Sequence, residues 1–211
     1  MRLACLIFDD ITVLDLLGPL EVLSRLPKAE IILFAPSMSP IITSISGVTL
    51  TPHTDIQNLE DVDVLLIPGG FGVRPLVKDK TLLARLAALH QTTRYTTSVC
   101  TGSLLLAAAG LLQGLEATTH WNSREQLEQF GARYTERRVV EHERLITAAG
   151  VSAGIDMALL LAARLTNEEI AKTIQLSIEY DPEPPFDAGS PAKAGPDIVA
   201  NVQIAVHSLN K

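Results

Sequence analysis

Short apolar runs alternate along this chain with segments whose apolar residues recur at helical spacing. The apolar runs are typical of strands that are buried on both faces of a sheet. They cover residues 3–8, 30–35 and 62–67. The segments with helical spacing, each expected to be a helix, cover residues 13–26, 81–90, 104–112, 123–130, 152–165, 167–180 and 198–209. The alternation predicts right-handed βαβ units, and therefore a flavodoxin-like three-layer α/β sandwich with a mainly parallel central sheet.

Shorter β-favouring segments complete the predicted order. Residues 41–44 and 48–51 flank Ser46-Gly47 and predict a β-hairpin, residues 139–147 predict a second one, and residues 117–121 predict a short strand. We expect one domain over residues 1–211. Residues 181–197 form a proline-rich arm within that domain, because this stretch holds five prolines and no apolar run.

Composition and charge narrow the classes of partner. The chain has 211 residues, of which 47% are hydrophobic and 19% charged, so it can bury a substantial core. Its net charge of −7 disfavours nucleic acid and anionic membranes as partners. No run approaches the ~18 apolar residues of a membrane helix. Two cysteines give no disulfide framework, so we expect a cytoplasmic protein with free thiols.

The segment from Tyr95 to Gly102 is the strongest candidate for chemistry. A β-favouring run, 95–99, meets Cys100-Thr101-Gly102, and a small-residue apolar helix follows at once. This order predicts a nucleophile elbow that presents the Cys100 thiol at the carboxyl edge of the sheet. The start of the helix is expected to lower the pKa of that thiol. The alternative is an inert cysteine buried in the core.

A glycine-rich turn follows the run at 62–67, in Pro68-Gly69-Gly70-Phe71-Gly72. It lacks the spacing and lysine of a phosphate-binding loop. We interpret it as half of an oxyanion site, in which the Gly70 N–H faces the Thr101 N–H across the sulfur. The alternative is a plain strand-to-helix turn.

Asp15 is an acid among apolar residues, close to the end of the first predicted strand. Buried carboxylates are rare unless they are paired or functional, so Asp15 is a candidate general acid beside Cys100. Desolvation and like-charge repulsion would then keep one proton on the pair. The alternative is a cap on the following helix.

Among the histidines, only His120 is placed to return to the same sheet edge, either as a structural donor or as a base. We expect Asp156 to be a buried acid bonded to loop backbone. No spacing of His, Cys or Asp resembles a metal site. Four further histidines are expected at the surface without a role: His53, His90, His142 and His207.

These motifs together resemble the PfpI-like branch of the class I glutamine amidotransferase-like superfamily, over essentially the whole chain. Four segments are closely similar to the isonitrile-hydrating enzymes of that branch. They are Leu14–Val22, Pro68–Gly70, Val99–Gly102 and Glu179–Phe186. The proteases and deglycases of the superfamily are expected to carry glutamate on the first loop, and the proteases histidine after the cysteine. Here these positions hold Asp15 and Thr101, which argues against both activities.

The resemblance implies hydration of a small-molecule isonitrile to an N-substituted formamide, without a metal or organic cofactor, in a homodimer. It implies Cys100 as the nucleophile of a covalent thioimidate, Asp15 as general acid and base, and a Thr101 hydroxyl that orients water. Gly70 and Thr101 N–H groups would hold the tetrahedral intermediate. Two alternatives stay open: another thiol-dependent hydrolase or glyoxalase/deglycase-type enzyme of this fold, and a non-enzymatic domain that senses a ligand or oxidation.

Overall fold

The computed structural model describes residues 1–208, and the chain divides into two compact units, Met1–Ile178 and a second unit that begins at Glu179. The first unit holds the whole central sheet. The prediction of one domain over residues 1–211 stays a prediction. None of the described helices is long and apolar enough to span a bilayer.

Within the described residues, the central sheet has seven strands in the order β10-β11-β7-β6-β1-β2-β5. Every neighbouring pair is parallel except β10 with β11, as the apolar runs predict. The strands are β1 (Arg2–Leu6), β2 (Glu30–Ala35), β5 (Thr54–Asp55), β6 (Val64–Ile67), β7 (Tyr95–Val99), β10 (Val139–His142) and β11 (Leu145–Ala148).

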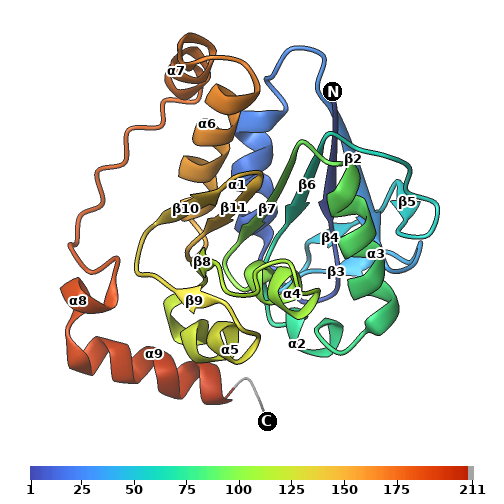
Figure 1. Ribbon diagram of the computed structural model, residues 1–211. Coiled ribbons are helices and arrows are strands. Elements are labelled where there is room, and N and C mark those ends of the chain that lie inside the picture. The colour runs from blue at the N-terminus through green and yellow to red at the C-terminus, as the bar shows by residue number, and fades with distance from the viewer. Residues whose placement is uncertain (209–211) are drawn as a thin grey trace. The chain divides into compact units, whose positions relative to one another are not determined.

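Helices cover both faces of this sheet and complete the three layers (Figure 1). On one face α1 (Val13–Leu23) packs against α6 (Ala153–Leu165), which in turn packs against α7 (Glu168–Ser177). On the other face α3 (Lys80–Thr92) packs against α4 (Gly102–Ala108), and α4 lies on β7. The flavodoxin-like α/β sandwich expected from the alternating pattern is therefore confirmed.

Smaller elements fill the connections. The hairpin around Ser46-Gly47 is formed by two short strands, and a second two-stranded sheet lies near the elbow helix. These elements are β3 (Ile41–Ile42), β4 (Thr49–Leu50), β8 (Glu116–Ala117), β9 (Arg133–Tyr134), α2 (Val73–Leu76), α5 (Arg124–Gln129) and the 3₁₀ turn η1 (Trp121–Ser123). The second unit holds α8 (Pro191–Ala194) and α9 (Pro196–Ser208).

Several boundaries differ from the sequence prediction. The elbow helix ends at Ala108, and the chain then turns through Gly110 in the left-handed region. The strand expected over 117–121 ends at Ala117, because the chain there enters a 3₁₀ turn. Four elements of two to four residues, β5, α2, β9 and α8, are too short to produce a period. Residue 209, the expected end of the last helix, lies outside the described residues.

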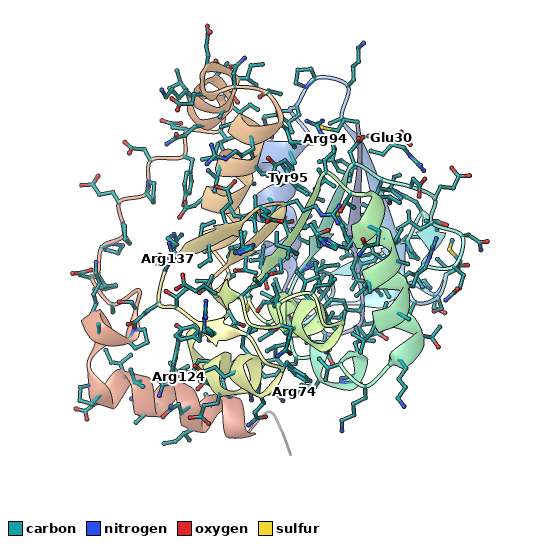
Figure 2. All side chains as sticks on the ribbon, viewed as in Figure 1. Glu30, Arg74, Arg94, Tyr95, Arg124 and Arg137 are labelled. Carbon is teal, nitrogen blue, oxygen red and sulfur yellow. The ribbon has the colours of Figure 1, made fainter. Side chains whose placement is uncertain are left out.

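Parallel pairing brings the carboxyl ends of β1, β6, β7 and β11 to one edge of the sheet. Figure 2 labels Arg94 and Tyr95 at the amino end of β7, and Arg74, which follows β6, toward the opposite end. The loop before α1, the Pro68–Gly72 turn, the Cys100 elbow and the connection from β11 to α6 therefore meet at the carboxyl edge. Ligand sites of open parallel sheets lie at this edge.

Candidate active site

Cys100 occupies a strained turn between β7 and α4. Its φ of 57° lies in the left-handed region, which non-glycine residues adopt only when their surroundings hold them there. The Cys100 N–H donates to the carbonyls of Ala148 (3.1 Å) and Ala149 (2.9 Å). The Cys100 carbonyl accepts from the hydroxyls of Ser103 (3.1 Å) and Thr119 (3.0 Å). These four bonds fix the elbow, and the residue retains only 5% exposure.

Asp15 lies in the first turn of α1 and is completely buried. Its Oδ2 accepts the Gly69 N–H at 2.9 Å, and its carboxyl group is hydrogen-bonded to the Cys100 thiol. Among residues 1–208, no N–H or O–H group donates to the other oxygen, Oδ1. The alternative role as a helix cap is wrong, because Thr12 holds the N-cap position of α1.

Burial dominates the protonation of this pair. It raises the pKa of Asp15 to about 7, although the hydrogen bonds from Gly69 and Cys100 act to lower it. Burial also raises the pKa of Cys100, and the nearby Asp15 charge raises it further. The N–H groups of Thr101 and Val151 oppose that rise without overcoming it. The lowered thiol pKa expected from the helix start is therefore wrong: the Cys100 thiol keeps its proton at neutral pH, and Asp15 is the group of the pair that titrates there.

The Pro68–Gly72 turn is wedged between the elbow and the first loop. A Cβ atom on Gly69 would lie 2.6 Å from the Thr101 nitrogen and 2.8 Å from Asp15 Oδ2, so only glycine fits between the two groups. The Gly70 N–H donates to Thr101 Oγ1 at 3.0 Å, and that hydroxyl in turn contacts the Gly70 carbonyl at 3.3 Å. The Gly70 N–H thus faces the Thr101 hydroxyl. Its role toward an intermediate stays a prediction.

Val151 is a site residue that no sequence motif indicated. It follows β11, the strand beside β7, and its N–H donates to the Cys100 sulfur together with the Thr101 N–H. Its φ of 32° is unfavourable for a β-branched side chain. The only sequence signal was the position of Ala149-Gly150 after an apolar strand that ends at the same edge as the elbow.

His120 borders the site without a described contact to the pair. Its Nδ1 accepts the Asn122 N–H at 3.3 Å, which leaves the proton of the neutral ring on Nε2. Burial lowers the pKa of His120. The ring packs beside Gly150, where an added Cβ atom would lie 2.9 Å from Cδ2. In these contacts His120 accepts one hydrogen bond and packs beside Gly150; the part of His120 in catalysis stays a prediction.

Two expectations about other polar residues are corrected. His90 is buried, and its Nδ1 bonds the Thr96 hydroxyl at 2.9 Å beneath α3. Apolar neighbours at helical spacing gave no sign that this histidine turns inward. Asp156 is only partly buried and pairs with the Arg138 guanidinium. The side chain of His207 is outside the described part of the chain.

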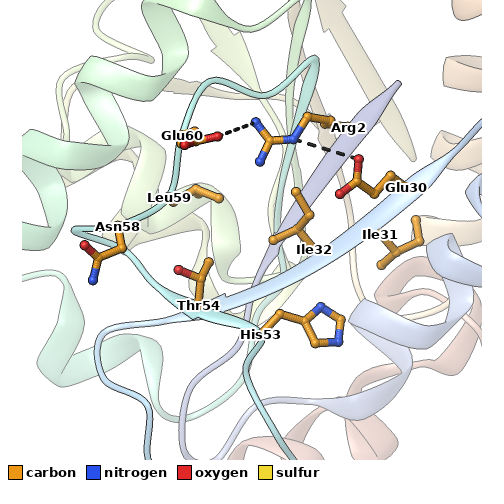
Figure 3. Close-up of a pocket in the computed structure, with 9 residues that line it drawn as sticks. All are labelled: Arg2, Glu30, Ile31, Ile32, His53, Thr54, Asn58, Leu59 and Glu60. Atoms are coloured by element: carbon orange, nitrogen blue, oxygen red, sulfur yellow. Dashed lines mark ion pairs between the residues drawn. The ribbon is translucent and has the colours of Figure 1, made fainter.

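A surface hollow of about 440 Å³ lies at the opposite edge of the sheet, at the amino ends of β1 and β2 (Figure 3). Arg2 crosses it and pairs with the exposed Glu30 (4.0 Å) and Glu60 (3.6 Å). It contains none of the predicted site residues. Among the described residues, no group of three or more His, Cys, Asp or Glu side chains is arranged to hold a metal ion.

Alkylation should separate the two thiols. We expect iodoacetamide to label Cys100, which retains slight exposure in the native protein, whereas Cys5, within β1 and completely buried, stays unlabelled. The rate at Cys100 should keep rising above pH 7, because burial and Asp15 oppose the thiolate. Peptide mapping across pH measures both. A rate that levels off below pH 7, or equal labelling of both thiols, contradicts this description.

A mainly parallel α/β sandwich with a buried cysteine on a strained elbow, next to a carboxyl group from the first turn of α1, defines the class of this protein. The chain belongs to the DJ-1/PfpI family, whose sequence profile matches residues 1–164. It is 43% identical to isonitrile hydratase of Pseudomonas putida over 94% of this chain and 87% of that enzyme.

The chain is also similar to two further proteins. The crystal structure of a THiJ/PfpI family protein from Pseudomonas syringae is closely similar, with a TM-score of 0.91 and 40% identity over 98% of this chain and 86% of that one. A helix-turn-helix transcriptional regulator of Pseudomonas aeruginosa, GbdR, is 30% identical over 64% of this chain, which spans 37% of the regulator.

Proposed function

We propose that this chain hydrates isonitriles, R–N≡C, to N-substituted formamides, and that Cys100 and Asp15 carry the reaction. The observation that carries the proposal is the buried, hydrogen-bonded Asp15–Cys100 pair in a chain 43% identical to an isonitrile hydratase. A nucleophile that shares one proton with an adjacent acid is what addition to an isonitrile carbon requires. Formation of the formamide from an aromatic isonitrile, followed by chromatography, tests the proposal.

In the first step the thiol adds across the terminal carbon. Asp15 takes the proton from Cys100 and delivers it to the isonitrile carbon, while the sulfur forms a bond to the same carbon. The product is a thioimidate, R–N=CH–S–Cys100, and Asp15 is left as a carboxylate. Because burial raises the pKa of Asp15 to about 7, this group both accepts and donates a proton readily near neutrality.

In the second step water attacks the thioimidate carbon. Asp15 removes a proton from the water and passes it to the nitrogen, which gives the tetrahedral R–NH–CH(OH)–S–Cys100. The carbon–sulfur bond then breaks, the hydroxyl proton returns to the pair through Asp15, and the formamide leaves. The balance is one isonitrile and one water consumed for one formamide, so the pair is restored in each cycle.

Backbone N–H groups support the sulfur in this scheme. Thr101 and Val151 donate to the Cys100 sulfur, which favours the thiolate as it forms and when it leaves. The Gly70 N–H donates to Thr101 Oγ1 at 3.0 Å, so it can bind an intermediate only after this hydrogen bond breaks. We propose that the bond breaks when the hydroxyl binds the attacking water. His120 has no described contact with Cys100 or Asp15, so any effect of His120 on the reaction would be indirect.

Thr101→Val should separate the two roles of this hydroxyl. The substitution keeps the volume and the backbone N–H but deletes both contacts to Gly70. We expect a rate loss of about ten- to a hundredfold, the effect of one unmade hydrogen bond. If the hydroxyl orients water, the Cys100 thioimidate accumulates and intact-protein mass spectrometry detects the mass of the added isonitrile.

Thr101→Ser is the matched control, because it retains the hydroxyl and should retain most of the rate. Normal turnover in Thr101→Val contradicts water positioning by this residue. A slow variant without a trapped adduct, and with lowered thermal stability, shows instead that the hydroxyl only ties the Gly70 turn to the elbow.

The 30% identity to a transcriptional regulator favours one competing role, a domain that senses a ligand or oxidation through Cys100. A glyoxalase- or deglycase-type activity is the competing chemistry of the fold. Product analysis with an aromatic isonitrile and with methylglyoxal distinguishes the three. Catalytic turnover of methylglyoxal, or of neither compound, contradicts the proposed hydration.

We further propose that the protein acts in the cytoplasm as a homodimer. Leu14 and Leu17 support a partner on α1, since both are apolar and more than 40% exposed on either side of the buried Asp15. Light scattering at micromolar concentration tests the association. A mass equal to the 22.7 kDa of one chain contradicts the dimer.

A further inference from the structure

The connection from β11 to α6 is held at both ends by one residue, Arg138. The Arg138 carbonyl, just before β10, accepts the Ala149 N–H at 2.9 Å. Its guanidinium Nε bonds Asp156 Oδ2, and NH2 bonds Ser152 Oγ at 3.2 Å. The main chain of Arg138 therefore binds Ala149, just before residues 150–151, and its side chain binds Ser152, just after them.

The held segment is strained. Val151 adopts a φ of 32°, and such a conformation of a β-branched residue persists only where the surroundings determine it. This conformation presents the Val151 N–H to the Cys100 sulfur. An exposed ion pair alone contributes little to stability, and the Arg138 and Asp156 side chains are 50% and 30% exposed. The contacts of Arg138 therefore matter less for the stability of the fold than for the position of residues 150–151.

We propose that Arg138, through Ser152 and Asp156, is a positioning residue that keeps the Val151 N–H on the Cys100 sulfur. The inference rests on the proposed use of Cys100 as a nucleophile, not on the identity of the substrate. It assigns a role in reactivity to a side chain that touches none of the reacting groups.

The chain supplies a matched control at the other end of the same helix. Arg164, in the last turn of α6, forms two 2.9 Å bonds with Glu141 on β10. Its exposure, 49%, and that of Glu141, 27%, are close to those of the Arg138–Asp156 pair. The two pairs both tie α6 to the β10 segment, but only the first lies next to Val151.

The experiment compares Arg138→Gln with Arg164→Gln in the full chain. We expect Arg138→Gln to slow alkylation of Cys100 by iodoacetamide about tenfold, the effect of one charge-assisted hydrogen bond, and to lower kcat similarly with little change in KM. Arg164→Gln should leave both rates within about twofold of the wild-type values. Asp156→Asn, which keeps the side-chain shape, is the second variant in case Arg138→Gln does not fold, and should slow alkylation in the same way.

Arg138→Lys separates position from charge. Lysine keeps the positive charge but cannot hold Ser152 and Asp156 with a planar fork, so it should remain severalfold slower than wild type. Full recovery with lysine overturns the proposal, as do equal effects of the Arg138 and Arg164 variants or an unchanged alkylation rate. The alkylation arm needs no isonitrile, so a wild-type protein that hydrates none refutes the proposed function and still tests this inference.

Discussion

Replacing Cys100 with serine should abolish isonitrile hydration while leaving the fold intact. Serine is close in size to cysteine and should adopt the φ of 57° at this position without added strain. Its hydroxyl, however, is far less acidic than a thiol. Asp15, with a pKa of about 7, cannot generate an alkoxide. We expect the rate to fall by roughly 10⁴-fold or more, as for other nucleophile replacements, in assays of formamide formation.

Cys5→Ala is the control for this experiment. Cys5 lies within β1, pairs with Leu33 and Leu66 on the two neighbouring strands, and is fully buried. The substitution should lower stability modestly through a small cavity and leave the rate per folded molecule unchanged. Substantial turnover in Cys100→Ser, or its loss in Cys5→Ala, would refute Cys100 as the nucleophile.

Asp15→Asn should have the second-largest effect. Asparagine retains the shape of the side chain and an acceptor for the Gly69 N–H, but it cannot move a proton between sulfur, substrate and water. We expect a loss of about 10²–10⁴-fold in kcat, the range for a lost general acid and base. Asp15→Glu should be partly active, because its extra methylene displaces the carboxyl in a fully buried site. Wild-type kinetics in Asp15→Asn would exclude the proton-transfer role.

The same substitution should stabilise the protein above neutral pH. Folding raises the pKa of Asp15 from 3.8 to about 7, so the folded chain binds the proton more tightly than the unfolded chain. Below pH 3.8 Asp15 is protonated in both states and does not change the free energy of unfolding with pH. As the pH rises from 3.8 toward 7, the unfolded chain loses this proton first, so the folded state is progressively destabilised. A rise of this size in the pKa corresponds to on the order of 4 kcal/mol in the free energy of unfolding. Asp15→Asn should therefore melt above wild type at pH 8, and the difference should shrink on acidification.

The architecture was predictable because the strands and helices are each marked by a local pattern of apolar residues. Apolar runs that alternate with helical spacing predicted the parallel sheet, and the carboxyl-edge rule then predicted that Asp15, Gly69 and Cys100 meet. The contact between Asp15 and Gly69 joins residues 54 positions apart, yet both follow strands that are neighbours in the sheet.

What the sequence did not predict depends on distances within the packed site. The direction of the Cys100 pKa shift follows from the degree of burial, which no motif encodes. The bond between Gly70 and the Thr101 hydroxyl depends on how closely two loops approach. Val151 enters through its backbone, which any residue type offers, so the identity of its side chain gave no signal.

Rapid-quench peptide mapping during turnover of an aromatic isonitrile tests covalent catalysis by Cys100 most directly. We expect the peptide carrying Cys100 to gain the full mass of the isonitrile, since addition expels no leaving group. This adduct should form and decay at least as fast as formamide accumulates. Formamide that accumulates while Cys100 stays unmodified would contradict the covalent route.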